Sequence, residues 1–180
     1  MAGPLTDGKI TLRAPLLEDA QTHCDAVLES MAEAGRWLEW VHDGYTVEDS
    51  SAFIARAIAG HENGEMYEFL IFDAAGAFIG GCGLNRLDTR FLKSNLGYWV
   101  RSGANGRGVA TAATGLVARF GFEQLALQRI EIIAATGNLA SQRVAEKAGA
   151  QREGVLRNGI RYRGENIDAV CFSLIPRDLG

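Results

Sequence analysis

The chain has 180 residues and a formal net charge of −4, with 47% apolar and 22% charged residues, the ordinary composition of a soluble globular protein. A mildly acidic chain argues against nucleic-acid binding, which usually needs a basic face. No apolar run approaches the ~20 residues that a membrane span requires. We therefore expect one domain over residues 1–180, with a sizeable core, no nucleic-acid partner and no membrane segment.

The cysteines and the N-terminus indicate the compartment. Cys24, Cys82 and Cys171 are widely separated and form no CxxC pair, so we expect reduced thiols. The first residues contain no apolar segment of the signal-peptide type. The three histidines are scattered, with no carboxylate at ligand spacing. These features predict a cytoplasmic protein without a metal.

Hydrophobic periodicity divides the chain into strand and helix segments. The helix at 46–64 shows the clearest signals, with Thr46 as N-cap, Asp49 three residues later and Gly64 at its end. This order favours an α+β (mixed α/β) fold, with helices packed on a mixed, largely antiparallel sheet. Strands are expected at 8–15, 66–73, 78–88, 91–101, 127–136 and twice around the turn at 163–166, and helices at 16–30, 46–64, 114–125 and 138–149.

A glycine-rich segment, GANGRGVATAATG at 103–115, lies between an expected strand and an expected helix. Successive glycines let backbone N–H groups approach an anion, and the N-terminus of the next helix adds partial positive charge. The segment is either a phosphate or pyrophosphate loop or a plain turn. A P-loop is excluded because its Lys is missing, and a dinucleotide fingerprint fits poorly because Thr111 replaces its third Gly.

Three stretches together resemble the GNAT acyltransferase superfamily, and within it the ribosomal-protein N-acetyltransferase (RimJ/RimL-like) branch. NGRGVA at 105–110 is similar to the family's pyrophosphate loop, [QR]-x-x-G-x-[GA]. Asn138, Ser141 and the EKAG that follows are similar to its second motif, and RWLEW at 36–40 resembles a Trp-Leu-x-Trp segment of the branch. The likeness covers nearly the whole chain. It implies a GNAT-like central sheet of about seven strands flanked by about four helices.

The resemblance implies direct transfer of an acetyl group from acetyl-CoA to a primary amine, and it assigns the cofactor contacts. Loop N–H groups would hold the pyrophosphate, with Arg107 or Arg101 adding charge. The pantetheine arm would pair with the strand before the loop, where the N–H of Trp99 or Val100 would steady the thioester oxygen. Asn138 would be a helix cap or a pantetheine ligand. The implied acetyl-CoA contacts are Trp99, Val100, Arg101, Asn105, Gly106, Arg107, Gly108, Val109, Ala110, Thr111, Asn138 and Ser141.

The catalytic groups are only partly implied. Ser141 is expected to protonate the leaving thiolate, or alternatively to bond its own backbone. The general base does not carry over, because neither the strand before the loop nor the C-terminal hairpin has a carboxylate at the family positions. Glu39, Glu68 and Asp168 remain conceivable, but the sequence gives no positional reason for any of them.

The acceptor is expected to carry an amine, either a protein N-terminus or a small amine. Apolar walls with few polar groups suit its cleft. Gly97 would form the bulge that separates its strand from the strand at 127–136 and opens the cleft. The expected acceptor contacts are Trp37, Trp40, Asn85 and Tyr98, with Tyr45 and Tyr162 beside them.

Several alternatives stay open at this point. Arg157, Arg161 and Arg163 would contact an acidic acceptor or the CoA ribose phosphate, or form a solvated face. The missing base motivates a CoA-binding module without catalysis. A small-molecule or antibiotic acetyltransferase, a nucleotide-binding oxidoreductase and a homodimer are also compatible with the sequence.

Overall fold

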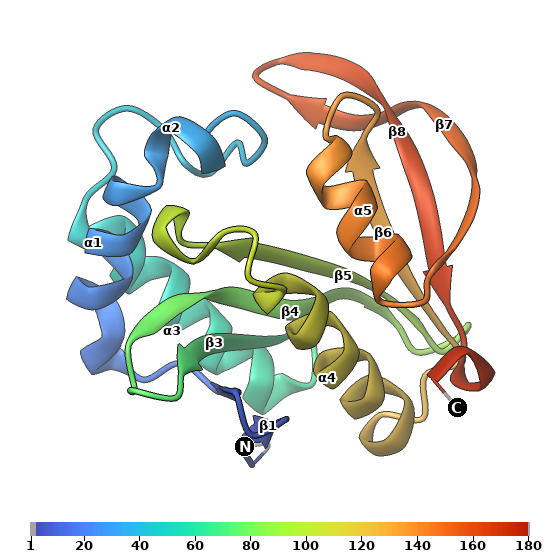
Figure 1. Cartoon of the computed structure of the whole chain (residues 1–180), viewed down its shortest axis with the longest axis horizontal. Helices are drawn as coiled ribbons and strands as arrows, with labels where there is room; N and C mark the ends of the chain where they lie inside the picture. Colours follow the sequence, from blue (N-terminus) through green and yellow to red (C-terminus); the bar gives the residue numbers. More distant parts are fainter. Residues whose placement is uncertain (1–2, 180) are drawn as a thin grey trace.

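The computed structural model describes residues 3–179, which contain an eight-stranded sheet in the order β1-β2-β3-β4-β5-β6-β8-β7 (Figure 1). Every neighbouring pair is antiparallel except β5 and β6, which are parallel. This confirms the mixed, mostly antiparallel sheet expected from the sequence. The strands are β1 Leu5–Thr6, β2 Ile10–Arg13, β3 Tyr67–Asp73, β4 Phe78–Asp88, β5 Lys93–Val100, β6 Arg129–Ala135, β7 Gln151–Tyr162 and β8 Glu165–Leu174.

The helices are α1 Ala20–Glu29, α2 Met31–Ala34, α3 Val47–Asn63, α4 Val109–Gln124 and α5 Leu139–Lys147. Two elements were not expected, β1 and α2, because each is too short to show a period in the sequence. The predicted start of the fourth helix was wrong. It begins at Val109 rather than at residue 114, since alanines favour the helix and Gly108, at φ 80°, provides the left-handed entry.

Local signals explain α3 well. The backbone N–H of Thr46 donates to Asp49 Oδ2 at 2.9 Å, and the side chains form a capping box. Gly64 ends the helix at φ 70°, a left-handed conformation that glycine adopts without strain. Both boundaries agree with the sequence prediction, because both depend on residues adjacent in the chain.

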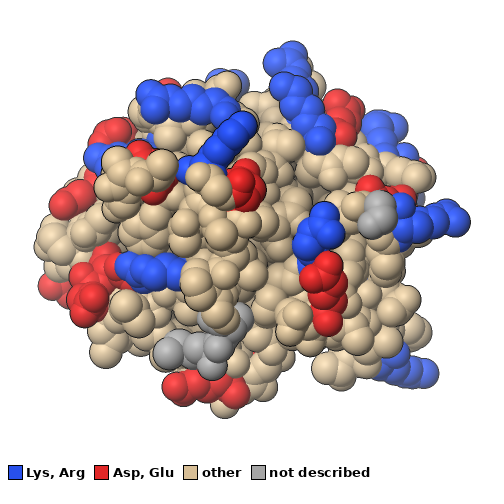
Figure 2. Space-filling model, turned by 60° about the horizontal axis from the view of Figure 1, so that its bottom comes forward, with Lys and Arg blue, Asp and Glu red and all other residues tan. Residues whose placement is uncertain are grey.

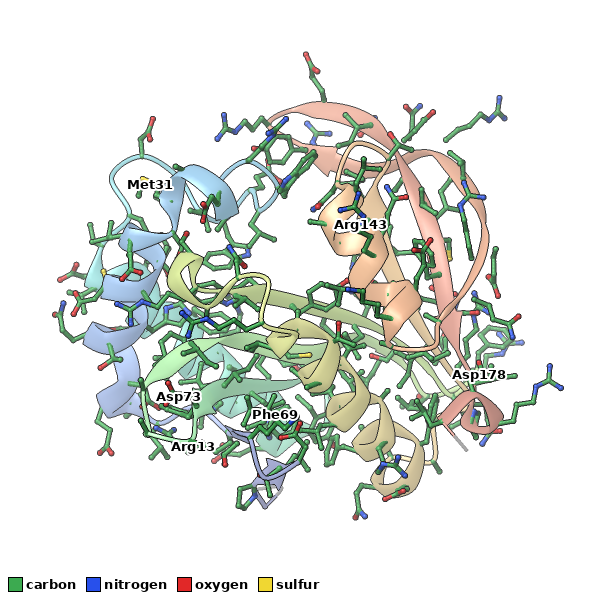
Figure 3. The ribbon with its side chains drawn as sticks, viewed as in Figure 1. Arg13, Met31, Phe69, Asp73, Arg143 and Asp178 are labelled. Carbon is green, nitrogen blue, oxygen red and sulfur yellow. The ribbon has the colours of Figure 1, made fainter. Side chains whose placement is uncertain are left out.

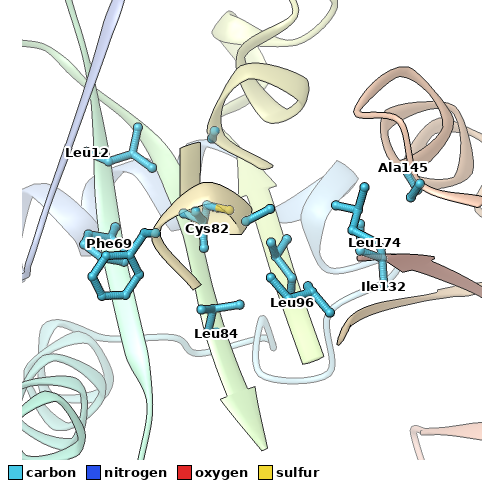
Figure 4. Packing of buried hydrophobic residues seen from close by; sticks show 14 of the residues in the cluster. Leu12, Phe69, Cys82, Leu84, Leu96, Ile132, Ala145 and Leu174 are labelled. Carbon is cyan, nitrogen blue, oxygen red and sulfur yellow. The ribbon is translucent and has the colours of Figure 1, made fainter. Parts of the chain in front are cut away.

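Helices cover both faces of the sheet. In Figure 1, α4 lies in front of the strands and α3 behind them. The larger core lies on the α4 side, where Leu12, Phe69, Cys82, Leu84 and Leu96 from neighbouring strands are buried together (Figure 4). Because side chains alternate along a strand, the intervening residues face α1 and α3 instead. Ala26 of α1 packs there against Leu70 and Phe78, with Trp99 at the edge.

The parallel pair is the place where the sheet opens. The β5–β6 ladder runs from Lys93↔Arg129 to Asn95↔Glu131 and then stops. Beyond that point β5 continues along β4 and β6 continues along β8, so the two strands diverge (Figure 1). The bulge expected at Gly97 is not found, because the β4–β5 register is regular from Gly80↔Val100 to Asn85↔Asn95. The separation comes from the two strands following different neighbours.

Charges are mixed on the surface. On the face drawn in Figure 2, Lys and Arg side chains are interspersed with Asp and Glu around a largely uncharged centre.

Cys24, Cys82 and Cys171 are free and buried. Between residues 3 and 179, no helix combines the length and the apolar character that crossing a bilayer requires. The same residues contain no group of three or more His, Cys, Asp or Glu side chains that could hold a metal ion.

Candidate functional site

A cleft of about 660 Å³ occupies the place where β5 and β6 separate. Its walls include residues 96–100 of β5, the loop before α4, β6 and one face of α5 along its whole length. Figure 3 shows Met31 of α2 and Arg143 of α5 on opposite sides of this opening. Arg143 and Lys147, four residues apart on one face of α5, both line the cleft. These two cations were not among the residues predicted from the sequence, although a spacing of four residues on one helix is a readable signal.

The loop before α4 presents unpartnered backbone amides to the cleft. Gly108 caps α4 without a side-chain hydrogen bond, and the first helical bond runs from Ala112 N to Gly108 O at 3.0 Å. The N–H groups of residues 109–111 therefore have no partner within the helix. A Cβ at Gly106 or Gly108 would meet nothing within 4 Å. The loop is thus open, with donors and partial positive charge suited to an anion.

The free edge of β5 provides a second row of donors. The N–H of Arg101 donates to Ile79 O at 2.9 Å, which directs it towards β4. Because alternate amides of a strand point to the same side, the N–H of Trp99 also faces β4, whereas those of Tyr98 and Val100 face the cleft. Of the two amides expected near a thioester oxygen, only that of Val100 therefore points into the cleft.

Asn138 and Ser141 open α5 at the wall of the cleft. Asn138 Oδ1 accepts from the backbone N of Ser141 at 3.1 Å, so Asn138 is the helix cap. The Tyr98 hydroxyl donates to Ser141 O at 2.8 Å and lies 3.1 Å from Ser141 Oγ. Burial raises the pKa of Tyr98 to about 12, although the bond with Ser141 opposes the shift. The phenol therefore stays protonated at neutral pH and can act as a proton donor with Ser141.

Not every expected cofactor residue reaches the cleft. Asn105 and Gly106 line it, together with residues 108–111. The guanidinium of Arg101 instead forms an ion pair with Glu29 of α1. Arg107 is exposed on the loop and lies outside the lining. The charge that these two arginines were expected to add is therefore not directed at the cleft.

A second cavity of about 810 Å³ lies on the α3 side of the sheet. Gly97, Tyr98 and Trp99 belong to the walls of both cavities, so the two meet at β5. The expected acceptor residues Trp37, Trp40, Asn85 and Tyr98 all line the second cavity, as do Tyr45 and Tyr162.

Glu68 of β3 also lines this second cavity. The carboxylate lies over Gly83, since a Cβ at Gly83 would come within 2.2 Å of Glu68 Oε2. Burial raises the pKa of Glu68 to about 7, partly offset by a hydrogen bond from Asn85 and by the charge of Arg56. The sequence offered no reason to select Glu68, because its place beside β5 depends on the register of three successive strands, β3, β4 and β5, which the sequence does not show.

Of the other two carboxylates, Glu39 contacts the β7–β8 hairpin and Asp168 is part of it. Glu39 Oε1 accepts from the backbone N of Arg163 at 3.1 Å, and Asp168 Oδ1 accepts from that of Asn158 at 2.9 Å. The hydroxyl of Tyr162 donates to Gly35 O at 2.6 Å and holds the hairpin against the end of α2. Glu39 and Asp168 therefore have structural roles, because each binds a backbone N–H of the hairpin.

The chain is similar to known proteins over most of its length. Residues 9–151 match the family described as "Acetyltransferase (GNAT) domain". YdaF of Bacillus subtilis (strain 168), named as a candidate ribosomal N-acetyltransferase, is 29% identical over 176 residues, covering 94% of this chain and 92% of that protein.

The chain is also similar to solved structures. A candidate ribosomal-protein-serine acetyltransferase from Vibrio cholerae has a TM-score of 0.85 at 26% identity, covering 97% of this chain and 98% of that one. RimJ from Mycobacterium smegmatis in complex with CoA-disulfide has a TM-score of 0.87 at 24% identity, covering 98% and 88%. The second likeness shows a shared fold.

Proposed function

The chain belongs to the GNAT acetyltransferase family and is an N-acetyltransferase, and we propose that it transfers acetyl directly from acetyl-CoA to an amine in a ternary complex. The observation that carries this proposal is the meeting of two cavities at Gly97, Tyr98 and Trp99. One cavity has anion-binding amides and a free strand edge, and the other has aromatic walls. Two substrates can therefore approach the same segment of β5 from opposite faces of the sheet.

The cleft on the α4 side suits acetyl-CoA. Amides of residues 109–111 would bind the pyrophosphate, and Arg143 and Lys147 would add positive charge. The pantetheine arm would pair with the free N–H groups of Tyr98 and Val100, so that the Val100 amide stabilises the thioester oxygen as charge develops. Ser141, with Tyr98 beside it, would protonate the leaving thiolate.

The cavity on the α3 side would receive the amine. Trp37 and Trp40 form part of its wall beside polar side chains such as Glu68 and Asn85, and aromatic walls with converging polar groups are typical of ligand sites. The names of YdaF and of the Vibrio cholerae protein make an N-terminal peptide the first acceptor to test, followed by small amines. A cytoplasmic location, which suits the three free thiols, and one domain over residues 1–180 belong to the same proposal.

An acceptor screen tests this function. The protein is incubated with acetyl-CoA and with short peptides that begin with Ser, Ala or Met, or with small primary amines, and the products are identified by mass. We expect one class to gain an acetyl group. Acetyl-CoA binding without acetylation of any acceptor would instead indicate a CoA-binding module that has lost catalysis.

A further inference from the structure

The cavity on the α3 side contains three carboxylates, and two of them are engaged in local structure. Asp49 caps α3 by accepting from Thr46 N at 2.9 Å and from Thr46 Oγ1 at 3.2 Å. Glu39 binds the backbone of Arg163. Glu68 neither caps a helix nor binds the hairpin backbone. Within residues 3–179, no cationic side chain lies at ion-pair distance from it.

Glu68 is aligned with the segment of β5 where the two cavities meet. The register pairs Glu68 with Gly83 and Gly83 with Gly97, so the three residues form one row across β3, β4 and β5. Directly paired residues share a face of the sheet, and neighbouring strands lie ~4.8 Å apart. Since the carboxylate already lies over Gly83, about one strand spacing separates it from β5.

The two glycines in this row keep the space open. A Cβ at Gly83 would collide with Glu68 Oε2, so only glycine lets the carboxylate reach over β4. At Gly97 the position of a Cβ is empty, and its nearest neighbour would be Asn85 Nδ2 at 3.9 Å. No side chain of this row therefore separates the carboxylate from the backbone of β5.

A pair of amides lies beside the carboxylate. Asn95 Nδ2 donates to Asn85 Oδ1 at 3.1 Å, and the Asn85 side chain favours the charged form of Glu68, which lowers the pKa of that carboxyl. Asn85 and Asn95 are paired across β4 and β5. The buried environment gives the carboxyl a pKa of about 7, and a base titrating near the working pH is the most effective.

We propose that Glu68 is the general base of the acetyl transfer, which rests on the function proposed above. The acceptor nitrogen attacks the thioester carbon, the C–N bond forms and the C–S bond breaks. The amine proton moves to the Glu68 carboxylate, directly or through one water, and then to solvent. The sulfur leaves with the C–S electron pair and takes a proton from the hydroxyl of Ser141 or Tyr98, which solvent replaces. The products are the N-acetylated amine and CoA.

Glu68→Gln tests this role, because it keeps the shape of the side chain and removes the basic oxygen. With acetyl-CoA and the best acceptor of the screen, we expect kcat/KM to fall about 100-fold, the lower range for general-base catalysis. The Kd for acetyl-CoA, measured by calorimetry, should stay within about twofold, since Glu68 lies on the other face of the sheet from the anion-binding amides. Glu65→Gln, an exposed carboxylate three residues earlier, is the matched control and should leave both values unchanged.

The pH profile separates a base from a structural group. In the wild type, kcat/KM should rise with pH through an apparent pKa near 7 as Glu68 loses its proton, and Glu68→Gln should lose this limb. Titration of the acceptor amine is common to both proteins and cancels in the comparison. The other charged or imidazole side chains lining this cavity are Glu39, His42, Asp49, Arg56, Arg86 and Arg161.

Chemical rescue gives a second measurement. Glu68→Ala leaves a space for a small carboxylate, so formate should restore part of the rate while chloride at the same concentration should not. The proposal is overturned if Glu68→Gln keeps the wild-type rate and pH profile, or if the loss is independent of pH and formate has no effect. A wild type that acetylates nothing in the screen overturns the function itself, which is seen without any variant.

Discussion

On the α4 side of β5, the cleft presents backbone donors, the free amides of residues 109–111 and the open edge of the strand, beside the side chains of α5. On the α3 side, the cavity is built from side chains, including Trp40, Glu68 and Trp99. Backbone contacts need only a local conformation, which a short run of residues specifies. A wall of side chains needs several segments brought together. The loop on the first side therefore carries its motif in one short run, whereas on the second side only RWLEW at 36–40 resembles a family motif and the remaining wall comes from separate segments.

The difference also concerns tolerance to substitution. Asn105 stands where the family pattern has Gln or Arg, but the amides that follow are positioned by the left-handed backbone of Gly106 and Gly108, not by the side chain of Asn105. Glu68 depends on Gly83 and Asn85 beside it. Variants on the two sides of β5 should consequently have separable effects, on acetyl-CoA affinity for the first and on turnover for the second.

The largest effect is expected for Gly108→Glu. The residue has φ 80° and precedes the free amides, so the variant strains the backbone and places a negative charge at the anion site. We expect the Kd for acetyl-CoA to rise at least about 100-fold by calorimetry, since charge repulsion adds to the lost geometry. Gly76→Glu, also at φ 80° and open to solvent in the β3–β4 turn, is the matched control. Unchanged affinity in Gly108→Glu would refute the assignment.

Gly97→Ala should lower turnover by obstructing the acceptor cavity, with little effect on the binding of acetyl-CoA. The new methyl group would occupy the space between Glu68 and β5 without colliding with protein atoms, since its nearest neighbour is 3.9 Å away. We expect kcat to fall by about 10- to 100-fold through displacement of the reacting groups, with the acetyl-CoA Kd changed less than about threefold. Gly154→Ala on β7, equally open, should change neither. Wild-type turnover in Gly97→Ala would show that the acceptor approaches elsewhere.

An intermediate loss of kcat is expected for Ser141→Ala, which removes a hydroxyl from the wall of the acetyl-CoA cleft. The cap of α5 survives, because Asn138 Oδ1 binds the backbone N of Ser141 and not its hydroxyl. We expect kcat to fall about tenfold, more than KM for acetyl-CoA rises, because the hydroxyl acts mainly on the leaving thiolate. Tyr98→Phe measured beside it shows which hydroxyl gives the proton. A normal kcat in Ser141→Ala would transfer that role to Tyr98.

The smallest effect is expected for Arg101→Ala. Its guanidinium is paired with Glu29 on α1, so it adds little to the cleft. We expect the Kd for acetyl-CoA to change less than about threefold, in the range of a partly exposed ion pair. Glu29→Ala, which frees the guanidinium, should act equally weakly. A large loss of affinity in Arg101→Ala alone would show that this arginine turns into the cleft when acetyl-CoA binds.

Elements with local signals could be predicted from the sequence. Thr46, Asp49 and Gly64 bound α3, and alternation marks β3 and β4. Errors arose where boundaries depend on a neighbour in space. The start of α4 was placed too late because residues 103–115 were interpreted as one glycine-rich loop, although the alanines after Gly108 favour a helix. The bulge at Gly97 was wrong because the separation of β5 from β6 follows from their other partners, β4 and β8.

The sequence by itself indicated a glycine-rich loop suited to an anion, the Asn138–Ser141 helix start and the order of the longer elements, because each is a relation between residues close in the chain. Only the tertiary structure decided which N–H groups of β5 are free, that Tyr98 meets Ser141, and that Arg101 is engaged by Glu29. It also placed Glu68 in one row with Gly83 and Gly97. The physical reason is that strand pairing sets this row, and strand register depends on the packing of the whole sheet.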